Sequence, residues 1–210
     1  MTAMPTQTPG KNPFALPTAA LQKAVEDEWA SHKKFSPSAM PLTALAYTAI
    51  DQMEGKREHI VEVLMAYIDT DTLSYRSASQ KLLEQQKKEW DPILAWAGGK
   101  FSALWKTTTG VMPLSQPEAL HEAVAEYLGS LDAMRLSAAC VLASGFSSLV
   151  LAMAVLEKQL SAERAFALSR LEEESQALAW GRDEEADERM RRLQAEIVET
   201  GRFLRLLETP

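Results

Sequence analysis

The sequence predicts a mainly α-helical protein, a compact multi-helix domain packed around a buried apolar central helix. Three observations support this fold class. Apolar residues recur at helical spacing through most of the chain after Thr18. The 21 residues 136–156 contain no charged side chain, although the chain as a whole is 24% charged. Only one run, residues 106–114, is rich in β-branched residues and favours an extended conformation.

Composition agrees with an ordinary globular protein. The chain has 210 residues, of which 46% are hydrophobic, so it can bury a sizeable core without disulfides. Cys140 is the only cysteine and lies inside the uncharged stretch. No internal disulfide is possible, which is typical of a reducing compartment, and we expect Cys140 to be a small core residue and not a nucleophile.

The charge balance argues against nucleic acid as a partner. The formal net charge is −7 and the isoelectric point is about 5.1. Nucleic-acid binders gain affinity by neutralising phosphates with lysine and arginine, and an acidic chain has no excess of these residues. The first residues show neither a basic region followed by an apolar one nor an arginine-rich presequence, so we expect no export signal there.

The first half of the chain begins with an arm. Residues 1–17 hold four prolines and little periodicity, which predicts an extended arm. Thr18 is a suitable N-cap for a helix over residues 19–32. Two further helices are expected over residues 41–53 and 56–68.

The next helix is expected to be interrupted by a proline. It begins near Ser77 or Ser79 and ends at Trp90, because Asp91 precedes Pro92 and the residue before a proline is disfavoured in a helix. Pro92 can then open a new helix through "ILAWAGGKFSALW", with Asp91 as its cap.

The second half is also predicted to be helical. Prolines keep the extended run 106–114 a loop, and Pro117 opens a helix that ends near Leu128. After the uncharged stretch, a helix that begins at a serine cap is expected over residues 161–180, followed by a last helix over residues 183–207.

The uncharged stretch is long enough to cross a membrane, which takes about 20 apolar residues. Its composition favours a buried central helix instead, because it lacks an aromatic belt and a lopsided basic flank. Small and polar residues weaken its hydropathy: Ser137, Ser144, Gly145, Ser147 and Ser148. A membrane-anchored helical adaptor, with residues 136–156 as the anchor, remains the alternative.

Catalytic chemistry finds little support in the sequence. The three histidines, His32, His59 and His121, lie in charge-rich helices and are expected to be solvated. Zinc spacings, a GxGxxG fingerprint and a P-loop are absent from the sequence, and "GFSSL" lacks the second glycine of a nucleophile elbow. We therefore expect a protein that is not an enzyme, with no catalytic residue, cofactor or metal.

The acidic block near the C-terminus is more informative. Residues 172–199 hold ten acidic and four basic side chains, which accounts for −6 of the net −7. Within it, Glu172, Gln176 and Trp180 fall on one helical face, and Gly181 ends the helix. This pattern is typical either of a solvated face whose tryptophan belongs to the core, or of a polar recognition face with an aromatic anchor.

Five motifs, taken in order, resemble a known family. They are "MPLTALAYTAID", "TDTLSYR", "QKKEWDPILAW", "GVMPLSQPE" and "RLEEESQALAWG", and the resemblance extends from Pro9 to the last helix. The family is that of the assembly chaperones for the catalytic head of F-type ATP synthase, in the branch that escorts the alpha subunit.

The resemblance implies a non-catalytic chaperone that binds the unassembled alpha subunit and prevents its aggregation until it pairs with beta. It implies no cofactor, nucleic acid or stable membrane insertion, and we expect a monomer. By position, the client-binding residues are Glu172, Glu173, Gln176, Trp180, Gly181, Tyr75 and Arg76. The family's Gln and Trp-Asp-Pro element corresponds here to four residues that we expect to be structural: Gln86, Trp90, Asp91 and Pro92.

Two departures from the family pattern accompany the resemblance. Family members begin with a small β-rich domain, of which "TPGKNPFALPT" matches only the tail, so we expect residues 1–17 to be its remnant and residues 18–210 to form the helical chaperone domain. Ser175 stands where family members tend to carry an aromatic residue. The expected location is the bacterial cytoplasm, or the mitochondrial matrix in a eukaryote.

Overall fold

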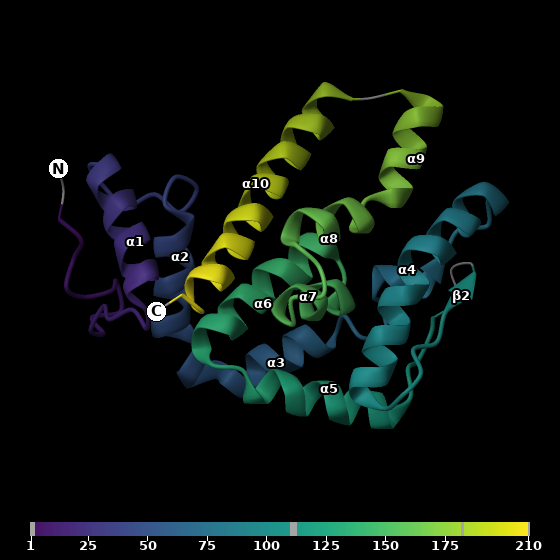
Figure 1. Ribbon diagram of the computed structural model, residues 1–210, viewed down its shortest axis with the longest axis horizontal. Helices are drawn as coiled ribbons and strands as arrows, with labels where there is room; N and C mark the ends of the chain where they lie inside the picture. Colours follow the sequence, from purple (N-terminus) through teal and green to yellow (C-terminus); the bar gives the residue numbers. More distant parts are fainter. Residues whose placement is uncertain (1–2, 110–112, 182, 210) are drawn as a thin grey trace.

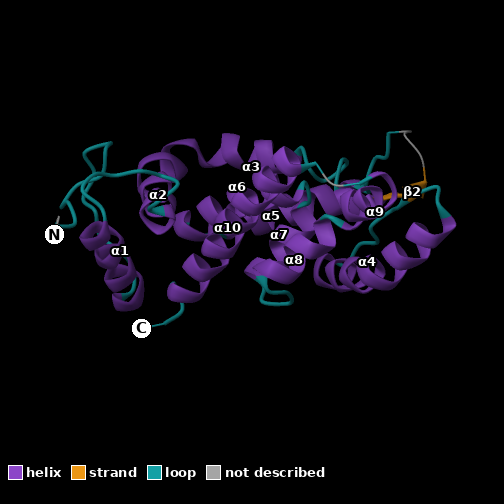
Figure 2. Cartoon of the chain, turned by 90° about the horizontal axis from the view of Figure 1, so that it is seen from above, coloured by secondary structure: helices purple, strands orange, loops and turns teal. Residues whose placement is uncertain are grey.

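Ten α-helices and a two-stranded sheet make up the part of the chain that the computed structural model describes, residues 3–109, 113–181 and 183–209. The prediction of a mainly α-helical fold is confirmed. Figures 1 and 2 show an elongated body with α1 and α2 at one end and α4 and α9 at the other. The long helix α10 runs from the tip of α9 back toward α1 and α2 (Figure 1).

The helices and strands follow one another in the order given by the sequence. The first half supplies α1 (Ala19–Ser31), α2 (Pro41–Thr48), α3 (Arg57–Met65), β1 (Tyr75–Arg76) and α4 (Gln80–Phe101). The second half supplies β2 (Thr108–Thr109), α5 (Glu118–Ser130), α6 (Ala133–Phe146), α7 (Leu149–Leu156), α8 (Ala162–Ser169), α9 (Leu171–Trp180) and α10 (Glu184–Leu206). The strands β1 and β2 pair in parallel, and β2 lies in the run 106–114 that was expected to be extended.

The uncharged stretch is buried, as predicted, but it forms two helices and not one. Residues 149–154 of α7 are fully buried at the centre of the larger core cluster. Between the helices, Ser147 takes a left-handed conformation (φ 51°) and Ser148 caps α7 by accepting a hydrogen bond from Leu151 N at 3.1 Å. Among the described residues, no helix combines the length and the apolar character that a membrane span requires. The membrane-anchor alternative therefore finds no support.

The fully buried Asp71 determines where this break falls. Its carboxylate accepts hydrogen bonds from Ser148 Oγ at 2.8 Å and from Val150 N at 2.9 Å, so it satisfies the first turn of α7 from a distant part of the chain. Leu73 N donates a third hydrogen bond at 3.0 Å, within the short 3₁₀ turn Thr72–Ser74. A carboxylate at a helix N-terminus is also favoured by the helix dipole.

The predicted helix stop at Trp90 is wrong, because α4 continues through Pro92. Pro92 lies on the exposed side of the helix and has no N–H to donate to the carbonyl of Lys88, four residues earlier. Lys88 is also exposed, so water can bind its carbonyl instead. On the opposite side, Ile93 and Leu94 are buried in the same core as Trp90. Tertiary burial therefore outweighs the local cost of the proline.

Two other helices are shorter than predicted. The helix expected over residues 161–180 breaks at Arg170, which gives α8 and α9 separate axes (Figure 1). The predicted cap Ser161 is confirmed, since its hydroxyl accepts a hydrogen bond from Arg164 N at 3.2 Å. The helix expected over residues 41–53 becomes a π-helical turn at Ala49–Met53.

The N-terminal arm packs against the helices. Phe14 is buried in the smaller core cluster, which surrounds α1 and α2. The carboxylate of Asp51 accepts hydrogen bonds from Thr8 Oγ1 at 2.5 Å, Gly10 N at 2.8 Å and Asn12 Nδ2 at 2.9 Å. These contacts hold a tight loop of the arm against the end of α2.

Helix α10 packs closely on α8 through Gly201, which supports a prediction about stability. A Cβ added at Gly201 would lie 2.6 Å from the Cβ of Ala162, a distance at which the helices must shift apart. We expect Gly201→Ala to lower the free energy of unfolding by about 1 to 3 kcal/mol in urea denaturation. The control is Gly99→Ala in α4, where nothing lies within 4 Å; it should raise stability by up to about 1 kcal/mol. Equal effects of the two substitutions would contradict the prediction.

Candidate functional site

The predicted site residues fall into two groups in the structure. Tyr75, Arg76, Gln86, Trp90 and Asp91 come together where β1 crosses α4, and we call them the Arg76 cluster. The other group, Glu172 to Gly181, lies on a separate element, α9. Both groups adjoin the junction of α4, α8 and α9, because α4 contacts α9 and α8 contacts α9.

Arg76 is buried, although it was predicted to bind a client. Its side chain is only 4% exposed and its guanidinium lies 5.2 Å from the centre of the Trp90 ring. Nη2 donates a hydrogen bond to Asp91 Oδ1 at 2.7 Å. Burial lowers the pKa of Arg76, and Asp91 acts in the opposite direction. The arginine therefore holds Asp91 in place at the surface of α4.

Other polar groups of the cluster fasten the surrounding elements. Gln86 is fully buried and accepts a hydrogen bond at Oε1 from Ser77 N, 2.8 Å away. Trp90 Nε1 donates to the backbone oxygen of Leu168 at 3.0 Å, which links α4 to α8. Tyr75 donates its hydroxyl to the backbone oxygen of Asp69 at 2.9 Å. The geometry is that of a buried polar network that positions β1 and α8 on α4.

The second group is exposed. We call residues 171–181 the α9 arm; it has no buried residue, and Figure 1 shows it extending from α8 at the end of the body where α4 lies. Trp180 is 89% exposed and Leu178 is 84% exposed. The interpretation that Trp180 belongs to the core is therefore wrong. Gly181 ends the helix with φ 94°, which is unfavourable for other residues.

The polar side of the α9 arm is acidic. Its first turn carries Glu172, Glu173 and Glu174. Gln176 Nε2 lies 3.5 Å from Glu172 Oε1, which confirms that these two side chains share a face. A row of carboxylates followed by two large apolar side chains can contact a partner that is both basic and apolar.

Arg170 anchors the arm to the body. Its guanidinium donates a hydrogen bond to the backbone oxygen of Gly145 at the end of α6 and lies 5.5 Å from the centre of the Phe166 ring. Nη1 also pairs with Glu173 at 2.8 Å. The base of the arm is therefore fixed to α6 and α8, while its far end is exposed.

Sequence reasoning missed two residues of this region. Leu178 was not singled out, although it stands two positions before Trp180 in the quoted motif. Asp71 lies inside another quoted motif, but only its long-range partners on α7 reveal its role. Among the described residues, no group of three or more His, Cys, Asp or Glu side chains is arranged to hold a metal ion.

Comparison with known proteins identifies related chains. A family model described as "ATP12 chaperone protein" matches residues 3–98, which include the Arg76 cluster. The mitochondrial protein atp12 of Schizosaccharomyces pombe is 30% identical over 159 residues, which cover 71% of this chain and 55% of that protein. This chain thus spans little more than half of its fission-yeast relative.

Solved structures match over nearly the whole chain. The crystal structure of Atp12 from Paracoccus denitrificans is 37% identical, with a TM-score of 0.90, and the match covers 97% of this chain and 88% of that one. The crystal structure of Atu1473, a putative chaperone from Agrobacterium tumefaciens, is 33% identical, with a TM-score of 0.86 and coverage of 97% and 76%. Unlike the family model, these matches extend over nearly all of the chain's length.

Proposed function

Because this chain belongs to the ATP12 family of ATP synthase assembly chaperones, we propose that its client is the unassembled alpha subunit of the F-type enzyme. In this proposal the chain is not an enzyme. It holds alpha until beta replaces it, in the bacterial cytoplasm or the mitochondrial matrix. An unassembled subunit exposes apolar surface that is an aggregation hazard, and a chaperone that covers this surface needs no catalytic group.

The observation that carries the proposal is the exposure of Trp180 and Leu178 on the α9 arm. Tryptophan is enriched among the residues that dominate binding energy at interfaces, and Leu178 adds exposed apolar surface on the same short helix. The carboxylates of Glu172 and Glu173 lie on the same short helix, so a client contact there combines apolar burial with attraction to basic groups.

The Arg76 cluster has a supporting role in this proposal. Arg76 is buried and fixes Asp91, whose side chain is more than half exposed, so Asp91 and not Arg76 is available to a client. Gln86 holds the end of β1 on α4, Tyr75 ties β1 to the turn after α3, and Trp90 holds α8, which carries the base of the α9 arm. The cluster therefore orients the arm.

The test is co-purification with alpha subunit expressed alone. We expect the wild-type chain to retain alpha, and the double variant Glu172→Ala, Glu173→Ala to retain at least about fivefold less, since two carboxylates of the proposed contact are lost. Glu173→Ala also removes the ion pair with Arg170, so Glu172→Ala alone, which keeps that pair, should show part of the loss. The matched control is Glu122→Ala, Glu126→Ala on the exposed side of α5, which should bind alpha like the wild type. Equal retention of beta by the wild-type chain would contradict the choice of client, and equal losses in both double variants would contradict the role of α9.

A further inference from the structure

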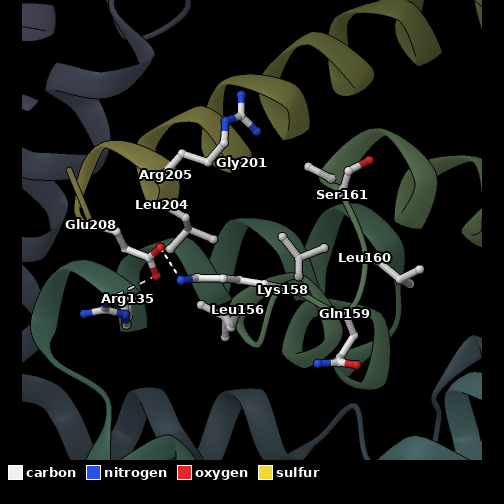
Figure 3. Close-up of a pocket in the computed structure, with 12 residues that line it drawn as sticks. Arg135, Leu156, Lys158, Gln159, Leu160, Ser161, Gly201, Leu204, Arg205 and Glu208 are labelled. Atoms are coloured by element: carbon white, nitrogen blue, oxygen red, sulfur yellow. Dashed lines mark ion pairs between the residues drawn. The ribbon is translucent and has the colours of Figure 1, made fainter. Parts of the chain in front are cut away.

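A cationic pocket lies at the opposite end of α10 from the α9 arm, roughly 30 Å away along the helix axis. It has a volume of about 340 Å³ and is formed by the end of α7, the turn into α8 and the last turns of α10 (Figure 3). Arg135, Lys158 and Arg205 line it, together with one acidic side chain, Glu208. Its lining thus carries a formal charge of +2 in a chain whose net charge is −7.

One carboxylate already lies in this pocket. Glu208 pairs with Lys158 and, at 3.7 Å, with Arg135, as the dashed lines in Figure 3 show. Arg135 is also paired with Asp132, at 2.5 Å. Arg205, whose guanidinium folds back over Gly201, makes no ion pair within 4 Å among the described residues but interacts electrostatically with Glu163. The pocket therefore holds one carboxylate between Lys158 and Arg135, and a carboxylate from another polypeptide can take its place.

The backbone at Lys158 determines where its side chain points. Its φ is 58°, in the left-handed region that favours glycine at the end of a helix. The conformation is fixed by a hydrogen bond from Gln159 N to the backbone oxygen of Ala154 at 2.8 Å. Lys11, Ser102 and Ser147 occupy the same left-handed region, so this conformation does not by itself mark a site, but it fixes the direction of the Lys158 side chain. Here it directs an ammonium group into the pocket (Figure 3).

The remaining walls are apolar and include Leu156, Leu160 and Leu204. A phosphate ion would leave these walls without a partner, whereas an acidic residue next to an aliphatic one would use both the cations and the walls. We propose that the pocket binds an acidic, aliphatic segment of a partner polypeptide, and that Glu208 is an internal latch which the partner's carboxylate displaces. The pocket and the α9 arm lie at opposite ends of α10, and the experiment below uses no ATP synthase subunit, so its result does not depend on the proposed client.

The test uses a labelled peptide with blocked ends and the sequence LLET, taken from residues 206–209, and fluorescence anisotropy. We expect Glu208→Gln to bind this peptide about tenfold more tightly than the wild type, because the competing carboxylate is gone. Adding Lys158→Gly should remove that gain without lowering the unfolding temperature, since glycine suits φ 58°. The peptide LLQT is the uncharged control.

Binding of LLET but not LLQT to the Glu208→Gln protein, weakened by Lys158→Gly and by added salt, would support the proposal. Equal binding of both peptides, or binding unaffected by Lys158→Gly, would overturn it. Calorimetric binding of inorganic phosphate to the Glu208→Gln protein without binding of LLET would also overturn it, because the pocket would then be a site for small anions.

Discussion

Replacing Asp71 with alanine is expected to lower the free energy of unfolding by about 3 to 5 kcal/mol at pH 7. The substitution leaves three donors without their acceptor: Leu73 N, Ser148 Oγ and Val150 N. Each buried donor without a partner costs about 1 to 3 kcal/mol. Urea denaturation followed by circular dichroism measures the change. The matched control is Asp183→Ala, which removes an exposed cap at the start of α10 and should cost only about 1 kcal/mol.

The pH dependence gives a second readout for the same residue. Burial raises the pKa of Asp71 from 3.8 to about 6, and its hydrogen bonds only partly oppose this. Between these two values the folded state binds more protons than the unfolded state, so the contribution of Asp71 to stability falls as the pH rises from 4 to 6. The loss is about 3 kcal/mol.

Comparison with the isosteric variant isolates this effect. Asp71→Asn cannot ionise, so the stability of the wild type relative to this variant should increase by up to about 3 kcal/mol as the pH is lowered from 7 to 4. A difference that stays constant over this range would show that Asp71 has the same pKa in both states. A cost of Asp71→Ala no larger than that of Asp183→Ala would refute its role in holding α7.

The second large effect is expected at the tip of the α9 arm. Replacing Leu178 and Trp180 together with alanine should weaken capture of alpha more than about thirtyfold. Anchor residues at interfaces contribute about 2 kcal/mol or more each, and 1.4 kcal/mol corresponds to a factor of ten. The unfolding temperature should not change, because neither side chain is buried in the free protein. Immobilised variants titrated with freshly refolded alpha subunit would measure the loss.

The chain offers a matched control for this double variant. Leu104, in the turn after α4, is 84% exposed, the same as Leu178, and it lies outside the α9 arm. Leu104→Ala should therefore leave capture unchanged. If it weakened capture as much as the double variant, the effect would come from general surface hydrophobicity. If neither protein lost capture, the α9 arm would not be the client contact.

The Arg76 cluster and the α9 arm show how far a site could be predicted. The face shared by Glu172 and Gln176 was predictable, since helical spacing alone places them together. The exposure of Trp180 was not predictable, because the same spacing fits a core face and a surface face of a helix. Only the packing of α9 against α4 and α8 distinguishes the two. Arg76 was expected to be available to a client, but it is buried beneath Asp91.

The sequence by itself determined the helical class, most of the helices and the family, because caps and periodicity are local signals that act within one or two turns. Thr18 and Ser161 cap the helices that they were expected to cap. Only the tertiary structure decided where the uncharged stretch divides and why α4 continues through Pro92. Asp71 reaches Ser148 across 77 positions of the chain, and the buried residues after Pro92 stabilise their helix from elements distant in sequence. Free energies that arise from such long-range contacts exceed the local preferences that a sequence displays.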